Sequence, residues 1–126
     1  MSAVSSHSQE SERFRRLSAI GQIGWWEADF TTRDYLCSEY VCNLLGMKGD
    51  TLTFREFGLY IREDYRERIS REFVSIEEVE VYEQTFPILA MHGVVWVRSR
   101  LGEKWMTEDG HLKAFGILQV VDAPEH

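Results

Sequence analysis

Residues 24–29 read Gly-Trp-Trp-Glu-Ala-Asp, and the alternation of apolar and acidic side chains continues as far as Phe30. Successive side chains of an extended strand point to opposite faces. Trp26, Ala28 and Phe30 therefore share one face, and the acidic residues lie on the other. This pattern predicts a half-buried strand over residues 25–30.

A helix is predicted before this strand. Phe14, Leu17 and Ile20 recur at three-residue spacing among charged residues, which gives a narrow apolar stripe on a helix over residues 11–20. Such a stripe needs a partner surface. Residues 1–10 are mostly small and polar, so we expect them to form a disordered lead-in.

A second strand and three helical segments are predicted after the first strand. The strand covers residues 35–37, and Ser38 can cap the helix that follows, which Gly46 ends. Residues 53–56 read Thr-Phe-Arg-Glu and fit a capping box. In this motif the Thr53 side chain accepts a hydrogen bond from the Glu56 amide, and the Glu56 side chain accepts one from the Thr53 amide. The third and longest helix begins near Asp64. Its apolar stripe consists of Tyr65, Ile69 and Phe73.

Three β-rich segments finish the chain, at residues 79–90, 94–106 and 111–121. Glycine-containing turns separate them, so we expect consecutive antiparallel strands. Pro87 has no amide hydrogen for a ladder bond, which favours an edge position for its strand. The last strand is apolar on both faces, so we expect either the N-terminal helix or a second subunit to cover the face turned away from the core helices.

Composition and charge limit the classes of function. The chain has 126 residues, of which 44% are hydrophobic and 13% aromatic, and this suffices for one core and one domain. A formal net charge of -7 argues against a protein that binds nucleic acid through its phosphates. The chain contains no run of about 18 apolar residues, the length needed to cross a membrane. The N-terminus lacks the apolar centre of a signal peptide. We therefore expect a cytoplasmic protein without direct membrane insertion.

The segments in this order resemble a PAS domain of the bacterial sensor histidine kinase type. The first strand is similar to the Gly-x-Trp-x-Trp-Asp of these domains, with Ala28 in place of the second Trp. Further similar motifs lie at Ser38-Glu39 with Leu45-Gly46, at Arg62-Glu63-Asp64-Tyr65-Arg66, and at Gly93 with Trp96. The closing Asp-Ile-Thr of the family is replaced by Val120-Val121-Asp122.

The resemblance implies an α+β fold. Its five-stranded antiparallel sheet has the order 2-1-5-4-3, with short helices on one face and an N-terminal flanking helix. On this basis the PAS domain spans residues 21–122, and residues 123–126 form a tail.

The resemblance also implies a function. Such a domain is the signal-sensing and interaction input module of a bacterial two-component sensor histidine kinase or a related signalling protein. It senses by binding a small ligand, by forming a homodimer, or by both, and an output domain in a longer protein carries the response. The domain itself is not an enzyme. Two alternatives stay open: a purely structural dimerisation module with a filled core, and an enzyme similar to ketosteroid isomerase, which would need a buried Asp or Tyr pair for proton transfer.

No cofactor or metal is expected. Flavin-binding photosensory relatives need a Cys in an Asn-Cys-Arg-Phe motif, which residues 54–75 do not contain. Haem-binding relatives commonly use a His on the long helix, which has none. The histidines of this chain lie in the tails or at predicted turns, as solvated side chains: His7, His92, His111 and His126. Cys37 and Cys42 match no redox or zinc spacing, so we expect structural, reduced thiols, with a local disulfide or a reactive thiol as the alternatives.

Two candidate sites follow from the strand alternation. The first is an apolar pocket formed by Trp26, Ala28, Phe30, Phe57, Ile61, Ile69, Phe73, Phe86, Ile88, Val95, Val97 and Leu118. Exchanging an indole for the methyl of Ala28 would vacate over ~100 Å³, so we expect Ala28 to make room for a small, largely apolar ligand, with a closed core as the alternative. The second is a dimer face formed by Phe14, Leu17, Ile20, Trp25, Trp96 and Phe115. The alternative to a dimer is that the flanking helix of the same chain covers the aromatic residues of this face.

Overall fold

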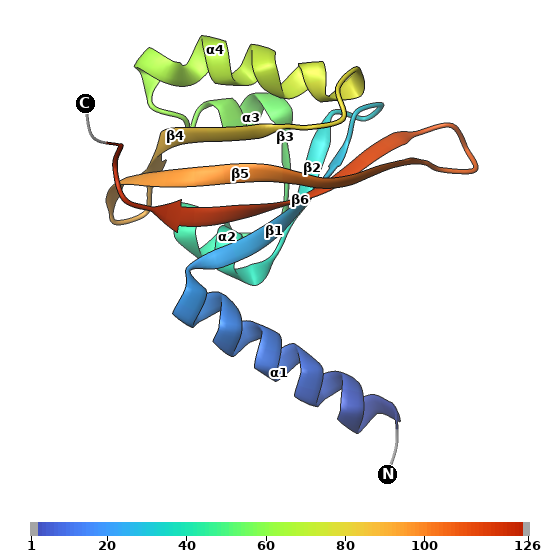
Figure 1. Cartoon of the computed structure of the whole chain (residues 1–126). Coiled ribbons are helices and arrows are strands. Elements are labelled where there is room, and N and C mark those ends of the chain that lie inside the picture. The colour runs from blue at the N-terminus through green and yellow to red at the C-terminus, as the bar shows by residue number, and fades with distance from the viewer. Residues whose placement is uncertain (1–2, 125–126) are drawn as a thin grey trace.

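The computed structural model describes residues 3–124, with side chains from residue 9 onward. The chain forms a curved antiparallel sheet with three helices against one face, and a longer N-terminal helix projects away from the sheet (Figure 1). Residues 122–124, which follow the last strand, belong to no helix or strand.

The sheet has six strands, each antiparallel to its neighbours. They are β1 (Ile23–Asp29), β2 (Asp34–Cys37), β3 (Thr51–Thr53), β4 (Glu83–Ala90), β5 (Gly93–Met106) and β6 (Leu112–Val121). Their order in the sheet is β3-β2-β1-β6-β5-β4. Without β3 this is the predicted order 2-1-5-4-3, so the predicted α+β architecture is confirmed with one strand more than expected. Strand β3 has only three residues, too few to show a period in the sequence, and it pairs with β2 at the edge of the sheet.

Strand β1 has the predicted alternation of buried and half-buried residues. Trp26, Ala28 and Phe30 are 4%, 0% and 6% exposed. Strands β2 and β6 flank β1 on its two sides. The stretch that starts at Gly24 therefore runs through the middle of the sheet, with its apolar side chains in the core.

Three helices follow β2 in the chain. They are α2 (Glu39–Leu45), α3 (Phe54–Gly58) and α4 (Glu63–Val74), and the 3-10 helix η1 (Ser75–Glu77) extends the last of them. The predicted capping box is confirmed, because Thr53 Oγ1 accepts from the Glu56 amide at 3.0 Å and Glu56 Oε1 accepts from the Thr53 amide at 2.8 Å. Gly46 ends α2 in the left-handed conformation with φ 75°, as predicted.

The start of α2 differs from the prediction. The hydroxyl of Ser38 does not cap the helix, but accepts from the Trp25 amide at 3.0 Å. Helix α2 lies so close to β1 that a Cβ at Gly24 would come within 2.5 Å of the Ser38 hydroxyl and 2.7 Å of Val41 Cγ2. Ser38 therefore ties the helix to β1, and only glycine fits at residue 24.

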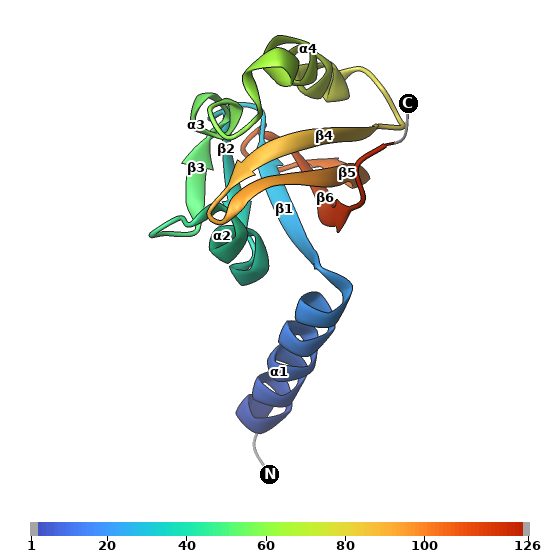
Figure 2. The same ribbon diagram turned by 90° about the vertical axis from the view of Figure 1, so that its left-hand side faces the viewer.

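Helix α1 (Ala3–Gly21) begins earlier than the predicted residue 11. Residues 3–10, which the sequence suggested as a disordered lead-in, are helical, whereas residues 1–2 lie outside the described residues. No Gly or Pro interrupts the helix before Gly21, and salt bridges link its successive turns, Glu10 to Arg13 at 2.7 Å and Glu12 to Arg15 at 2.8 Å. Both views show α1 pointing away from the sheet (Figure 1, Figure 2).

Strand β4 lies at the edge of the sheet, as Pro87 predicted. It begins at Glu83 rather than at residue 79, because η1 and a loop occupy the preceding segment. The chain before α4 partly covers this edge. The Arg62 amide donates to the Pro87 carbonyl at 3.0 Å, and the Leu89 amide donates to the Tyr60 carbonyl at 2.6 Å.

Candidate functional site

An apolar hollow lies between the inner face of the sheet and helices α3 and α4. Its volume is about 800 Å³. Buried walls come from β1 at Trp26, from β2 at Tyr35 and from α4 at Phe73. Exposed residues of the β1–β2 turn, α3 and α4 also line it, so the hollow reaches the surface between these elements.

The structure divides the predicted pocket residues into two groups. Seven of them line the hollow: Trp26, Phe57, Ile61, Ile69, Phe73, Phe86 and Leu118. Five belong to the packed core and do not line it: Ala28, Phe30, Ile88, Val95 and Val97. The hollow is therefore displaced toward α3 and α4 from the position that the strand alternation suggested.

The space above Ala28 is filled by a side chain. Ala28 pairs with Tyr35 across β2, and Trp26 and Phe30 flank it on the same face of β1. The ring of Phe73 contacts all three of these aromatic neighbours, with centroids 5.7 Å from Trp26, 5.4 Å from Phe30 and 5.2 Å from Tyr35. The small side chain of Ala28 therefore makes room for Phe73 and not directly for the hollow.

Polar groups in the hollow are neutral or cationic. The hydroxyl of Tyr35 makes no hydrogen bond to any side chain of residues 9–124 or to their backbone, although Tyr35 is only 6% exposed. Burial raises the pKa of Tyr35 well above its ordinary value, and burial likewise raises the pKa of Tyr82. Burial also raises the pKa of the Cys37 thiol to about 12, so this wall carries a neutral thiol and no nucleophilic thiolate.

Sequence reasoning missed several residues of the hollow. Tyr35 could have been found, because Tyr35 and Cys37 alternate with the exposed Leu36 along β2. Tyr82 and Ser99 also line the inner wall. Tyr82 lies in the loop before β4, where no periodic pattern exists to place its side chain.

Comparisons with known proteins concern the fold. Neither a protein-family model nor a curated protein matches the chain. Among solved structures, a sensory box histidine kinase/response regulator from Burkholderia thailandensis E264 is 18% identical with a TM-score of 0.65, covering 86% of this chain and 84% of that one. The N-terminal domain of a diguanylate cyclase with PAS/PAC sensor from Marinobacter aquaeolei is 15% identical with a TM-score of 0.65, covering 78% and 94%. A domain of a sensory box sensor histidine kinase/response regulator from Geobacter sulfurreducens is 18% identical with a TM-score of 0.55, covering 87% and 93%.

The chain has a PAS fold. The predicted resemblance is thereby confirmed at the level of the fold. In this PAS fold the hollow lies between the sheet and the helices that connect β2 to β4, and it is open to the surface.

The outer face of the PAS sheet carries the predicted dimer residues in two separate places. Trp25 of β1 and Phe115 of β6 stack with their ring centroids 5.8 Å apart. Trp96 of β5 instead packs against Tyr65 at 5.5 Å, and the guanidinium of Arg62 lies 5.8 Å from the centroid of its ring. The three aromatic residues Trp25, Trp96 and Phe115 therefore do not form one continuous patch.

Helix α1 reaches this outer face only at Trp25. Phe14, Leu17 and Ile20 are 47%, 67% and 84% exposed. Of these three, only Phe14 lines the shallow groove that α1 forms with Trp25 and the start of α2. In the described residues the intramolecular cover that the sequence left open is therefore partial: Phe14 lies at the groove beside Trp25, and Leu17 and Ile20 stay exposed.

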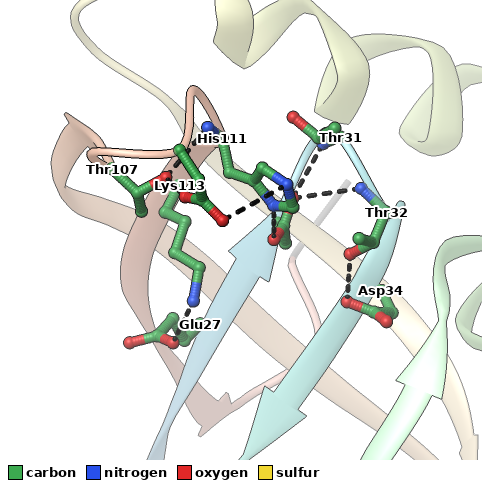
Figure 3. A network of polar contacts seen from close by, with 9 residues as sticks. Glu27, Thr31, Thr32, Asp34, Thr107, His111 and Lys113 are labelled. Atoms are coloured by element: carbon green, nitrogen blue, oxygen red, sulfur yellow. Dashed lines mark hydrogen bonds and ion pairs between the residues drawn. The ribbon is translucent and has the colours of Figure 1, made fainter.

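A polar network connects the ends of β1 and β6 in the PAS fold (Figure 3). Nδ1 of His111 lies 2.8 Å from Oδ2 of Asp29, whose Oδ1 accepts from the amides of Thr31 and Thr32 at 2.8 and 3.1 Å. Burial alone would raise the pKa of Asp29, but the hydrogen bonds from His111 and from the two amides outweigh it and lower the pKa to about 2. The hydrogen bond to Asp29 raises the pKa of His111. His111 is therefore a bonded, half-buried side chain and not the solvated histidine that the sequence suggested.

We expect the contact between Asp29 and His111 to stabilise the fold most between about pH 4 and pH 6.5. The raised pKa of His111 gives stability that is full below its ordinary pKa of 6.5 and is lost as the pH rises through the folded pKa. The lowered pKa of Asp29 gives stability that is present above 3.8 and is lost as the pH falls toward about 2. Asp109 also favours charged His111, and Lys113 opposes it.

The measurement is urea unfolding of the wild type and of His111→Asn at pH 5.5 and at pH 8.5. The free energy of unfolding of the wild type should exceed that of the variant by more at pH 5.5 than at pH 8.5. The difference in free energy of unfolding between the wild type and Asp29→Asn should likewise be smaller at pH 8.5 than at pH 5.5, because this variant removes the partner of the charged imidazole. An equal difference at both pH values would contradict the proposed linkage.

Other chemistry finds little support in residues 3–124. No group of three or more His, Cys, Asp or Glu residues in this range is placed to hold a metal ion. His92 lies between β4 and β5 and not on α4, and His126 and the side chain of His7 lie outside the described residues. Among these residues the hollow contains no Asp or Glu side chain. Two buried tyrosines line it, Tyr35 and Tyr82, but burial raises the pKa of both, which disfavours either as the base of a ketosteroid-isomerase-like enzyme. Cys37 and Cys42 are buried free thiols. No helix in this range is both long and apolar enough to span a membrane.

Proposed function

We propose that this chain is the cytoplasmic, signal-sensing input domain of a bacterial two-component sensor histidine kinase or a related signalling protein. Its signal is a small, largely apolar ligand that occupies the hollow. The domain does not catalyse a reaction, binds neither flavin nor haem, and passes its signal to an output domain in a longer protein. The PAS fold supports a sensor module of this kind.

The observation that carries the proposal is the hollow with the free hydroxyl of Tyr35 on its wall. A volume of about 800 Å³ lies within the range of roughly 300–1,000 Å³ typical of small-molecule sites. The Tyr35 hydroxyl has no hydrogen-bond partner among the described residues and is not fully desolvated, so it is free to donate to an acceptor on a ligand. A purely structural module would be expected to fill this space with side chains.

A route from the hollow to α1 runs through a short segment after β2. Tyr35 and Cys37 line the hollow, and Ser38 follows directly and bonds to the backbone of β1. Glu39, the next residue, pairs with Arg15 of α1 at 3.3 Å. We propose that ligand binding shifts β2 and thereby the packing between the sheet and α1.

Native mass spectrometry of the purified protein, compared with its denatured mass, tests ligand binding. A noncovalent mass increment on the native protein is expected. Tyr35→Phe removes only the hydroxyl and should lower the affinity for the ligand about five-fold, which appears as a smaller occupied fraction. Tyr60→Phe is the matched control, because Tyr60 packs against the core and does not line the hollow. A clean apo mass for the wild type would contradict the proposal and favour the filled-core module.

Homodimer formation is a second mode of signalling, favoured by the exposed apolar stripe of α1. A second copy of this chain is the partner that we propose, with Leu17 and Ile20 in the interface. Ile20→Glu would place a charge there and should weaken the dimer at least about ten-fold. Gln9→Glu adds the same charge to α1 at an exposed polar position and should change little. Light scattering over a concentration series measures both, and a wild type that stays monomeric at high concentration would contradict this mode.

A further inference from the structure

The lining of the hollow has a charge opposite to that of the whole chain. The chain has 21 acidic residues among 126 and a formal net charge of -7. The described lining nevertheless contains no Asp or Glu, and four arginines belong to it: Arg33, Arg55, Arg66 and Arg71. Acidic residues make up one in six of the chain, so their absence from a lining of this size is a marked depletion.

Three of these arginines are exposed and come from three different elements. Arg33 lies in the β1–β2 turn, with its guanidinium 5.3 Å from the centroid of the Phe54 ring. Arg55 is on α3, and Arg71 is on α4, where it forms a long ion pair with Glu67 at 3.8 Å. All three residues line the hollow and are exposed, so they belong to the part of its lining that reaches the surface.

The fourth arginine has a structural role. Arg66 donates from Nε to the Gly58 carbonyl at 2.8 Å and from Nη2 to the Ile61 carbonyl at 3.1 Å. It thereby holds the end of α3 beside α4, and its positive charge remains next to the hollow. Deeper inside, the hydroxyl of Tyr35 can donate a hydrogen bond, because the raised pKa of this residue keeps it protonated.

We propose that the ligand of the hollow is an amphipathic anion, with an apolar body inside and a carboxylate or similar acidic group at the arginines. This inference rests on the proposed function, because it specifies the chemistry of the ligand at the same site. Guanidinium groups bind carboxylates by charge-assisted, often bidentate hydrogen bonds. An ammonium group would find no carboxylate in the described lining, so the site disfavours cations as well as favouring anions.

The test uses a neutral fluorescent probe and three competitors with the same ten-carbon chain. N-phenyl-1-naphthylamine reports the apolar hollow by an increase in its fluorescence. Decanoate, decan-1-ol and decylammonium are then compared as displacing ligands. Decanoate should bind at least about ten-fold more tightly than decan-1-ol, and decylammonium should bind most weakly. High salt should weaken the binding of decanoate and leave the binding of decan-1-ol unchanged.

Two arginine variants on α4 provide a matched pair. Arg71→Gln should weaken decanoate about three-fold and leave decan-1-ol unchanged. Arg68→Gln is the control, because Arg68 is also exposed and also pairs with a glutamate four residues away, Glu72 at 3.9 Å, but does not line the hollow. Arg55→Gln combined with Arg71→Gln should weaken decanoate about ten-fold.

The outcomes separate this inference from the function on which it rests. If the probe binds and decanoate and decan-1-ol displace it with equal affinities, the inference of an anionic ligand would be wrong. The hollow would then remain a site for an apolar ligand. Equal effects of Arg68→Gln and Arg71→Gln on decanoate binding would also contradict the inference. The anion would then be attracted by the charges along α4 in general and not by the arginines that line the hollow. A protein that binds no probe at all would overturn both the anion and the ligand site.

Discussion

Replacing Phe73 with alanine is expected to lower the free energy of unfolding by about 4 kcal/mol. Phe73 is 7% exposed, and its ring contacts five other aromatic rings. These belong to Trp26, Phe30, Tyr35, Phe54 and Tyr82. Removing the ring takes away its buried area and leaves a void between β1 and α4 that rigid aromatic neighbours cannot easily close. Urea unfolding, monitored by tryptophan fluorescence, measures the loss.

Two further variants show whether the loss comes from the position of Phe73. Phe73→Leu keeps most of the apolar volume and should cost less than about 1.5 kcal/mol. Phe57→Ala removes the same ring from a half-buried position at the hollow and should cost clearly less than Phe73→Ala. If Phe73→Ala cost no more than Phe57→Ala, the ring would not be the centre of the aromatic cluster.

The parts of the fold that sequence predicted are those decided by local chemistry. The alternation from Trp26 to Phe30 determines which face of β1 is buried. The capping box of α3 depends on four consecutive residues, and the end of α2 depends on one glycine. Strand β3 was missed because its three residues are held by pairing with β2 and not by a pattern of their own. The start of α1 was missed because residues 3–10 have no apolar period like that of Phe14, Leu17 and Ile20, although the helix extends through them.

The site was predictable only in part, for a related reason. Alternation places a side chain on a face but does not say which other side chain fills the space beside it. The sequence showed that Ala28 is small where related domains have Trp, but not that Phe73, on a helix 45 residues later, takes the space. The arginines of the hollow come from a turn and two helices, and Asp29 and His111 are 82 residues apart. Such groups become neighbours only through the tertiary fold.

The relation between Ala28 and Phe73 leads to the last expected result, for Ala28→Trp. Ala28 is fully buried between Tyr35 and Ala114. The Phe73 ring contacts the aromatic side chains around it, those of Trp26, Phe30 and Tyr35. An added indole has no free volume there, so we expect a loss of about 3 kcal/mol from overpacking. This is opposite to the gain that would be expected if the hollow lay directly above Ala28.

A double-mutant cycle tests whether Phe73 is what excludes the indole. With Ala28→Trp present, the further change Phe73→Ala should cost at least about 2 kcal/mol less than it costs in the wild type, because the new indole can enter the vacated space. Tyr65→Ala is the control, since the Tyr65 ring packs against Trp96 and contacts none of Trp26, Phe30 and Tyr35; its cost should add to that of Ala28→Trp within about 0.5 kcal/mol. Additive costs for Ala28→Trp and Phe73→Ala would show that the two side chains do not share one space.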